Sequence, residues 1–243
     1  MKTFGLIGRN ISYSFSKAYF SQKFKAENIE AEYLNFDLQS IDQIHNILKE
    51  TPQLSGLNVT IPYKEEIIPF LSKLDSVAKE ILAVNTIKIE TDGSLTGYNT
   101  DYFGFQESLK PHLQAYHKKA LILGTGGASK AIAYALRNLK ISYTFVSRNP
   151  EKDQLSYTQL SKEVINENHL IINCTPLGTY PNIENFPPIP VEFLSPKHLI
   201  YDLIYNPEIT QLMKLALNAN AKVINGKKML QLQAEKAWEI WNR

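Results

Sequence analysis

The sequence has few of the features that mark secreted, membrane-bound or metal-rich proteins. Cys174 is the only cysteine in 243 residues, so no internal disulfide and no cysteine-based metal site can form. No apolar run approaches the length of a membrane-spanning helix, and the apolar start of the chain is too short for a signal peptide. We therefore expect a cytoplasmic protein without membrane attachment.

An excess of charge of one sign is also lacking. The 26 lysines and arginines nearly balance the 24 aspartates and glutamates, which argues against a protein that binds a nucleic-acid backbone. The five histidines are scattered, without helical pairs or neighbouring carboxylates, so neither a zinc site nor a Ser-His-Asp triad is indicated. We expect no metal and a small-molecule partner, with the chain a monomer or a homodimer.

Length and composition bound the architecture. At about 150 residues per domain, a chain of 243 residues corresponds to about one and a half domains. Hydrophobic residues make up 44% and charged residues 21% of the chain, which are ordinary globular values and exclude disordered, collagen-like and coiled-coil classes. The sequence therefore predicts either one large α/β domain or two small ones.

Strand and helix periods alternate through the first half. The pattern predicts helices over residues 16–28 and 41–49, and strands over residues 3–8, 32–38 and 54–61. This repeat is typical of a mostly parallel sheet. Two further strands flank Asp92-Gly93, a dipeptide typical of tight hairpins, so one antiparallel pair is also predicted.

The alternation restarts more strongly near residue 118. A buried strand over 119–123 leads through Gly124-Thr125-Gly126-Gly127 into a helix over 128–139. Further strands are predicted over 142–147, 170–174, 199–205 and 222–225, and a last helix over 227–242. We place a domain boundary between Asn99 and Lys118, crossed by a helix over 102–109.

The glycine-rich turn is typical of a dinucleotide-binding site. Gly124 and Gly126 allow a tight turn and close backbone approach to a pyrophosphate, whose charge is favoured at the start of the next helix. Ser129 stands at the third position, where glycine or alanine is usual. A glycine-rich turn without a ligand is the alternative interpretation.

The next strand indicates which dinucleotide is bound. It ends at Ser147-Arg148, where an NAD site would place a carboxylate for the ribose hydroxyls. An arginine suits the 2′-phosphate of NADP instead, with Lys152 as a second phosphate contact. The alternative for Arg148 is an ordinary exposed loop residue.

Hydroxyl, amide and lysine side chains gather at predicted strand ends in the first half. Open α/β sheets place ligand-binding groups there. Each motif also has a structural alternative, such as a helix cap for Ser14 or Ser16 and a turn residue for Asn85. The motifs are Ser14-Phe15-Ser16, Asn58-Val59-Thr60-Ile61-Pro62-Tyr63-Lys64, Ala83-Val84-Asn85-Thr86 and Asn99-Thr100-Asp101.

Taken in order, these motifs resemble the shikimate dehydrogenase family. The glycine-rich turn, Asp202-Leu203-Ile204-Tyr205-Asn206-Pro207, and the segment from Gly226 to Ala234 complete the resemblance, which spans nearly the whole chain. It implies an NADP-dependent oxidoreductase that reversibly reduces 3-dehydroshikimate to shikimate, in aromatic amino acid biosynthesis. It also implies a two-domain α/β fold with an N-terminal substrate domain, a Rossmann-like NADP-binding domain, and a C-terminal helix returning to the first domain. The corresponding ranges are 1–101 with 227–243, and 102–226.

The resemblance also implies roles for individual residues. Lys64 and Asp101 match the catalytic positions. The positions that bind substrate are matched by Ser14, Ser16, Thr60, Asn85, Tyr205 and Gln233. Those that bind the cofactor are matched by Gly124, Thr125, Gly126, Gly127, Ala128, Ser147, Arg148, Lys152, Thr175, Leu203 and Gly226.

Three positions depart from the family pattern. Tyr13 stands where the family usually has histidine, and Lys17 where proline usually follows the second serine. The family's Asn-Arg-Thr after the second cofactor strand is Ser147-Arg148-Asn149 here. Arg148 is retained, so the expected preference for NADP is retained with it.

Lys64 and Asp101 suit the proton step of such a reduction. A ring ketone needs a hydride on carbon and a proton on oxygen, and the cofactor supplies the hydride. Lysine ordinarily has a pKa near 10.4, so it carries a proton at neutral pH and can act as the general acid. Two other functions stay open: a quinate/shikimate dehydrogenase that uses NAD, and a non-catalytic sensor of a shikimate-pathway metabolite.

Overall fold

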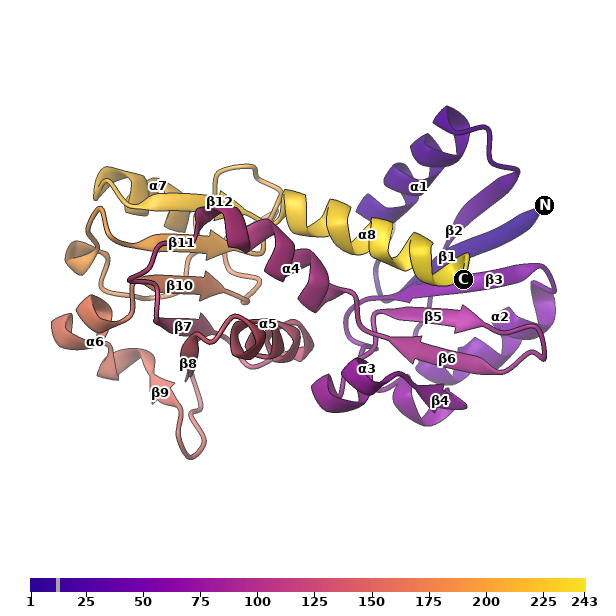
Figure 1. The fold of residues 1–243 in the computed structure, drawn as a ribbon, viewed down its shortest axis with the longest axis horizontal. Coiled ribbons are helices and arrows are strands. Elements are labelled where there is room, and N and C mark those ends of the chain that lie inside the picture. The colour runs from indigo at the N-terminus through magenta and orange to yellow at the C-terminus, as the bar shows by residue number, and fades with distance from the viewer. Residues whose placement is uncertain (12–13) are drawn as a thin grey trace. The chain divides into compact units, whose positions relative to one another are not determined.

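The protein folds into two compact units. A computed structural model describes residues 1–11 and 14–243. One unit consists of Met1–Asp101 with Gln233–Arg243, and the other of Tyr102–Leu232. Each unit is built around its own sheet (Figure 1). The chain thus leaves the first unit once and returns to it at its C-terminal end.

The first unit contains a mixed six-stranded sheet in the order β2-β1-β3-β5-β6-β4. β1 pairs in parallel with β2 and β3, whereas β5 is antiparallel to both β3 and β6. The expected hairpin lies between β5 and β6, where Glu90 and Ser94 pair and the Asp92 carboxylate accepts the Ser94 N–H. The strands are β1 (Lys2–Gly8), β2 (Ala31–Asp37), β3 (Leu54–Val59), β4 (Lys73–Leu74), β5 (Thr86–Ile89) and β6 (Leu95–Tyr98).

Short helices cover this sheet. They are α1 (Phe15–Ala26), η1 (Ile41–Gln43), α2 (Ile44–Glu50), η2 (Ile68–Phe70) and α3 (Ser76–Ile81). The predicted helix over 41–49 therefore begins with a 3-10 turn, which Ser40 and Gln43 cap reciprocally. On one side of the sheet, Ile44 and Ile47 pack against Ile7 and Leu57 in a continuous apolar core.

The end of α8 (Lys227–Trp241) completes the opposite side of the first sheet. Trp241 stacks on Phe4 with ring centroids 4.8 Å apart, and its indole N–H donates to the Ile87 carbonyl at 3.0 Å. Phe20 and Phe24 of α1 belong to the same cluster. Because aromatic side chains bury much apolar area each, this cluster attaches the last helix firmly to the first unit.

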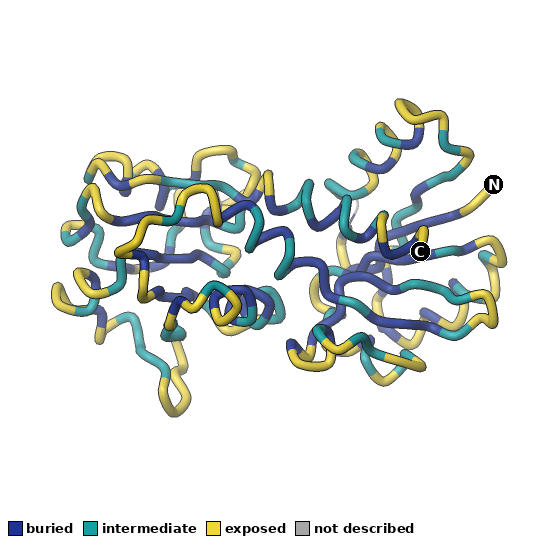
Figure 2. The backbone as a smooth tube through the Cα atoms, viewed as in Figure 1, coloured by how far each residue is buried: buried dark blue, intermediate teal, exposed yellow. Residues whose placement is uncertain are grey.

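The second unit has an entirely parallel sheet in the order β12-β11-β10-β7-β8-β9. Its central strands are buried along most of their length and consist mainly of apolar residues such as Leu121, Ile171 and Ile200, as expected when helices cover both faces. In Figure 2 they are dark blue, the colour of buried residues. The strands are β7 (Lys119–Leu123), β8 (Ser142–Ser147), β9 (Leu155–Ser156), β10 (Leu170–Asn173), β11 (Leu199–Asp202) and β12 (Lys222–Asn225).

In the second unit, two helices precede the first strand, and the others, apart from α8, lie between successive strands. They are α4 (Asp101–Leu109), η3 (Lys110–His112), α5 (Gly127–Asn138), η4 (Tyr157–Gln159), α6 (Lys162–Glu167), η5 (Val191–Phe193) and α7 (Gln211–Asn218). Two apolar clusters form its core: Ile122 and Leu136 belong to one, and Leu121 and Leu212 to the other.

The predicted fold class is confirmed, but two predicted strands, over 54–61 and 199–205, extend past the observed ones, and the first of these ends at Val59. The strand expected over 199–205 ends at Asp202, because the Asp202 carboxylate accepts the Ile204 N–H and turns the backbone away from the sheet. By its contacts, α8 belongs to the second unit up to Leu232 and to the first unit from Gln233 onward. The sequence placed this domain boundary after residue 226. Among the described residues, each helix is too short or too polar to span a bilayer.

Candidate active site and dinucleotide site

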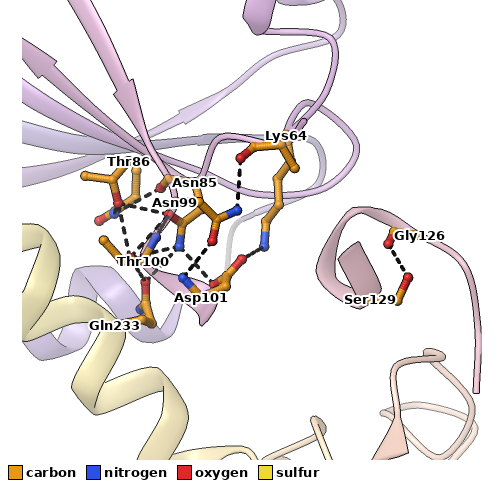
Figure 3. A network of polar contacts seen from close by, with 11 residues as sticks. Lys64, Asn85, Thr86, Asn99, Thr100, Asp101, Gly126, Ser129 and Gln233 are labelled. Carbon is orange, nitrogen blue, oxygen red and sulfur yellow. Dashed lines mark hydrogen bonds and ion pairs between the residues drawn. The ribbon is translucent and has the colours of Figure 1, made fainter. Parts of the chain in front are cut away.

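Lys64 and Asp101 form an ion pair in the first unit. The Lys64 Nζ lies 2.6 Å from the Asp101 Oδ2, and only 15% and 8% of the two side chains are exposed. Lys64 follows β3, and Asp101 begins α4 after β6, so two different strand ends supply the pair (Figure 3). A largely desolvated charge pair at this distance is stronger than an exposed one and keeps the ammonium in one position.

The buried amide of Asn85 orients the aspartate. Its Nδ2 donates to the Asp101 Oδ1 at 2.9 Å, which leaves Oδ2 for Lys64 (Figure 3). Its Oδ1 accepts the Thr100 N–H at 2.7 Å. A side-chain amide that accepts at one end and donates at the other cannot be inverted without losing both bonds. Asn85 therefore fixes which carboxylate oxygen faces the lysine.

Gln233 joins this group from the far end of the sequence. It lies on α8, is 5% exposed, and its Oε1 accepts the Asn85 Nδ2 at 3.3 Å. The Thr100 hydroxyl donates to the same oxygen at 3.4 Å. The structure thus brings together Lys64, Asn85, Asp101 and Gln233, four of the residues that the sequence singled out.

Ser14 and Ser16 lie at the start of α1. Ser14 is the N-cap, and its Oγ accepts the Lys17 N–H at 3.2 Å, so the structural alternative from the sequence is correct. That bond uses an acceptor lone pair of Ser14 and leaves its own O–H proton available for an anion. Ser14 and Ser16 are both partly exposed, and a helix N-terminus favours negative charge. Tyr13 lies outside the described residues.

Thr60 directly follows β3, four residues before Lys64. Its N–H donates to the Ile7 carbonyl at 2.9 Å, so β1 and β3 hold its backbone, and its side chain is partly exposed. Tyr205 belongs to the second unit, on the segment after β11, and 39% of it is exposed. Its grouping with the substrate residues of the first unit stays a prediction.

The glycine-rich turn joins β7 to α5 in the second unit. Gly124 has φ +99°, a conformation that favours glycine. Gly126 is the N-cap of α5 and has no side chain with which to cap the helix. A Cβ built on Gly126 meets no atom within 4 Å, so the space beside the turn is open. This arrangement fits the pyrophosphate of a dinucleotide, which would approach Thr125, Gly127 and Ala128 through their backbone.

Ser129 stabilises this turn rather than interrupting it. Its hydroxyl donates to the Gly126 carbonyl at 2.7 Å (Figure 3). Ser129 is 1% exposed, so a small residue is required, and the hydroxyl adds a bond that glycine or alanine cannot make. The departure from the usual motif therefore keeps the geometry of the turn.

Ser147 is the last residue of β8, and Arg148 follows it; β8 pairs with β7, the strand that leads into the glycine-rich turn. The Ser147 hydroxyl bonds to both the N–H and the carbonyl of Asn149, which tightens the loop. Arg148 and Lys152 are exposed, so their side chains are accessible to a phosphate. The donor types at this strand end fit the 2′-phosphate of NADP.

Asn173 and Asp202, both fully buried, organise the neighbouring strand ends. The Asn173 Nδ2 donates to the Asp202 Oδ1 at 3.0 Å, and its Oδ1 accepts both the N–H and the hydroxyl of Thr175. The Asp202 Oδ2 accepts the Thr210 hydroxyl at 2.7 Å. Burial raises the pKa of Asp202 to about 6, although its three hydrogen bonds act in the opposite direction.

Gly226 and Leu203 lie against each other in the same unit. A Cβ added to Gly226 would approach the Leu203 carbonyl oxygen to 2.0 Å, so only glycine fits between the two segments. The Gly226 N–H donates to the Ile204 carbonyl at 3.0 Å. Leu203 and Gly226, which were singled out separately, are thus one structural feature.

Several supporting residues received no role from the sequence. Asn58, Thr86 and Thr100 carry the hydrogen bonds of the first network, and Asn173 and Asp202 those of the second. Asn58, Thr86, Thr100 and Asp202 stand inside the motifs that pointed to the site, and Asn173 lies in the strand predicted over 170–174, so the signal was present. Which side chains face inward, however, depends on strand register.

Two histidines have structural roles, and the lone cysteine lies between Asn173 and Thr175 of the second network. His117 and His198 are buried and bond to backbone groups of Gln114 and Ser195, which is a structural role. Cys174 follows β10 and is only partly buried. Within the described part of the chain, no cluster of three or more His, Cys, Asp or Glu residues could hold a metal ion.

Comparison with known proteins identifies the family. Residues 6–87 match the model of the shikimate dehydrogenase substrate binding domain. A shikimate dehydrogenase (NADP(+)) of Clostridium botulinum is 41% identical over 99% of this chain and 96% of its own length. The chain belongs to the shikimate dehydrogenase family.

Solved structures of shikimate dehydrogenases agree with this fold. One in complex with NADP+ is 34% identical and superposes with a TM-score of 0.88, over 99% of this chain and 90% of that one. Another, from Thermus thermophilus in complex with NADP(H) and shikimate, is 29% identical with a TM-score of 0.87, over 99% and 93% of the two chains. The family model covers Ser14, Lys64 and Asn85 but ends before Asp101 and Gln233.

The raised pKa of Asp202 predicts a pH-dependent stability. Because the ordinary value is 3.8 and the folded value about 6, the folded chain binds this proton more tightly than the unfolded chain. The contribution of Asp202 is therefore fully present below pH 4 and falls by about 2–3 kcal/mol as the pH rises through 6. We expect Asp202→Asn, which keeps an acceptor oxygen, to remove this part of the pH dependence.

Urea denaturation of the wild-type protein and the variant between pH 4 and 8 measures the difference. Glu208→Gln, at an exposed carboxylate of the same unit, is the matched control and should retain the wild-type profile. Identical pH dependence in wild type and Asp202→Asn would contradict the prediction.

Proposed function

We propose that this protein is an NADP-dependent shikimate dehydrogenase, which reversibly reduces 3-dehydroshikimate to shikimate in aromatic amino acid biosynthesis. The observation that carries the proposal is the buried Lys64–Asp101 pair, held by Asn85 and Gln233, in a chain of this family. A carbonyl reductase needs a positioned proton donor, and this pair provides one.

Lys64 is the general acid of the reduction. NADPH, when bound, supplies the hydride to the ring carbon. The Lys64 ammonium donates a proton to the carbonyl oxygen as negative charge develops there, so the ketone gains one hydride and one proton and becomes an alcohol. In the reverse direction, neutral Lys64 accepts the hydroxyl proton. Asp101 holds the ammonium within 2.6 Å and stabilises its charge.

The start of α1 binds the substrate carboxylate. Ser14 and Ser16 lie at the N-terminus of a 12-residue helix, where an anion is favoured, and the Ser14 hydroxyl retains its proton for donation. Thr60, Asn85 and Gln233 surround the ring hydroxyls, and Tyr205 is the further residue that the sequence assigns to the substrate. Lys17, which stands where the family usually has proline, donates its backbone N–H to the Ser14 Oγ at 3.2 Å.

The second unit binds NADP. The backbone from Gly124 to Ala128 would hold the pyrophosphate of NADP, and Ser147, Arg148 and Lys152 would hold its 2′-phosphate. Thr175, Leu203 and Gly226 complete the cofactor site. Gly226 has its place because no larger residue fits against Leu203.

Other inferences from the sequence also belong to this proposal. The chain acts in the cytoplasm on small molecules, as a monomer or a homodimer, without nucleic acid or membrane as a partner. The first unit is the substrate domain and the second the cofactor domain, which gives each of the two sheets its own ligand.

One assay tests substrate, cofactor and activity together. NADPH absorbance is followed with 3-dehydroshikimate and, separately, with 3-dehydroquinate, and both are repeated with NADH. We expect turnover with 3-dehydroshikimate and NADPH to exceed the other three combinations. Equal use of NADH and 3-dehydroquinate would favour the quinate/shikimate alternative. Tight binding without turnover would favour a metabolite sensor.

Removal of the lysine amine should abolish most of the activity. We expect Lys64→Ala to lower kcat by about 10²- to 10⁴-fold with a smaller change in KM, because the proton is needed mainly in the transition state. Lys79→Ala, at an exposed lysine of α3 in the same unit, is the control and should retain wild-type kinetics. An unchanged kcat for Lys64→Ala would rule out the general-acid role.

Removal of the Arg148 guanidinium should weaken NADP binding selectively. A lost charge-assisted hydrogen bond costs about 1.5–3 kcal/mol, so we expect Arg148→Ala to raise the KM for NADP by about 10- to 100-fold. The KM for NAD, which lacks the 2′-phosphate, should change little. Arg137→Ala, on α5 of the same unit, is the matched control. Equal changes for both cofactors would refute the 2′-phosphate contact.

A further inference from the structure

Tyr33 is a buried tyrosine of β2 that connects two parts of the first unit. It is 3% exposed, and its ring stacks on Phe20 of α1 with centroids 4.9 Å apart and an interplanar angle of 12°. Its hydroxyl donates to the Asn58 Oδ1 on β3 at 2.8 Å. One side chain therefore contacts both the helix that begins at Ser14 and the strand that leads to Lys64.

Asn58 links Tyr33 to the residues that surround the Lys64–Asp101 ion pair. Its Nδ2 donates to the Thr86 Oγ1 and to the Asn85 carbonyl, both at 3.2 Å. The Thr86 hydroxyl donates in turn to the Asn85 Oδ1 at 3.1 Å, and the Asn85 Nδ2 donates to Asp101. In this series of hydrogen bonds, Asn58, Thr86 and Asn85 each accept one bond and donate the next.

The direction of this series of hydrogen bonds depends on its first donor, the Tyr33 hydroxyl. The Tyr33 phenol is deeply buried, which raises its pKa and keeps the proton on the oxygen, while the side chain of Ser16 hydrogen-bonds to it and opposes the shift. Because a protonated hydroxyl donates to Asn58 Oδ1, the Asn58 amide must present its Nδ2 to Thr86. In Figure 3, Thr86, Asn85 and Asp101 form one continuous set of contacts that reaches Lys64.

We infer that Tyr33 is a positioning residue for the dehydrogenase reaction: through Phe20 and Asn58, it fixes the carboxylate-binding start of α1 relative to the Lys64–Asp101 pair. This inference rests on the proposed function. The substrate must reach the serines with its carboxylate and the lysine with its ketone, so the spacing of the two groups matters. Residues that hold reacting groups in place influence the reaction rate even when they do not touch the substrate.

Tyr33→Phe tests the inference, because it removes one hydroxyl and keeps the ring that stacks on Phe20. We expect kcat/KM for shikimate to fall about 5- to 30-fold, since the Asn58 oxygen loses its donor and the amide its fixed orientation. The KM for NADP should remain within about twofold of wild type, because the residues proposed to bind NADP belong to the second unit.

Tyr201→Phe is the matched control. Tyr201 is also fully buried, and its hydroxyl pairs with the Ser108 hydroxyl at 2.7 Å in the second unit. The Tyr201→Phe substitution should lower the melting temperature about as much as Tyr33→Phe but leave kcat/KM for shikimate unchanged. Equal kinetic effects of the two variants would show a general packing role and overturn the inference.

A second variant keeps the test decisive if Tyr33→Phe does not fold. Thr86→Val removes the next hydroxyl of the chain with little change in shape, and we expect the same selective loss of kcat/KM for shikimate. Wild-type kinetics for whichever of these variants folds would refute the inference. Absence of shikimate oxidation in the wild-type protein would instead refute the proposed function, so the two failures are distinguishable.

Discussion

The arrangement of the first unit depends on the orientation of one buried amide, that of Asn85. It accepts the Thr100 N–H and donates to Asp101 and Gln233, so three segments distant in sequence are held at one point. In a low-dielectric interior each of these bonds is strengthened, and each would be costly to leave unpaired. Because the Asn85 amide has one fixed orientation, the Lys64–Asp101 pair has one as well.

Such a network must be enclosed by packing that excludes water. The aromatic cluster of Phe4, Phe20, Tyr33 and Trp241 provides it, and it also brings the end of α8 back to the first unit. Gln233 reaches Asn85 because Trp241, two helical turns further on, is anchored to the sheet. Packing and polar geometry are therefore coupled: the helix that supplies the glutamine is held by apolar contacts.

The second unit uses the same strategy at its own strand ends. Asn173 and Asp202 are both fully buried, and their hydrogen bonds to Thr175, Ile204 and Thr210 set the course of two loops. The raised pKa of Asp202 reflects the cost of that burial. Rigid loops on a parallel sheet suit a ligand that is bound through backbone groups.

The sequence by itself determined the order of strands and helices, the hairpin at Asp92-Gly93, the glycine-rich turn and the family. These features are local in the chain: periodicity, turn residues and short motifs are determined by neighbouring residues. It missed β4, β9, α3 and α6, which have six residues or fewer, and it extended β11 past Asp202. It also missed α7, although Leu212, Met213 and Ala216 recur there at helical spacing and are buried.

Only the tertiary structure decided which side chains meet. The pairing of Asp101 Oδ1 with Asn85, the return of Gln233, the Gly226–Leu203 contact and the chain from Tyr33 through Asn58 all join residues far apart in sequence. Each depends on strand register and on the packing of α8, which a linear pattern does not encode. The residue types of the site were set by the sequence, and their mutual orientation by long-range contacts.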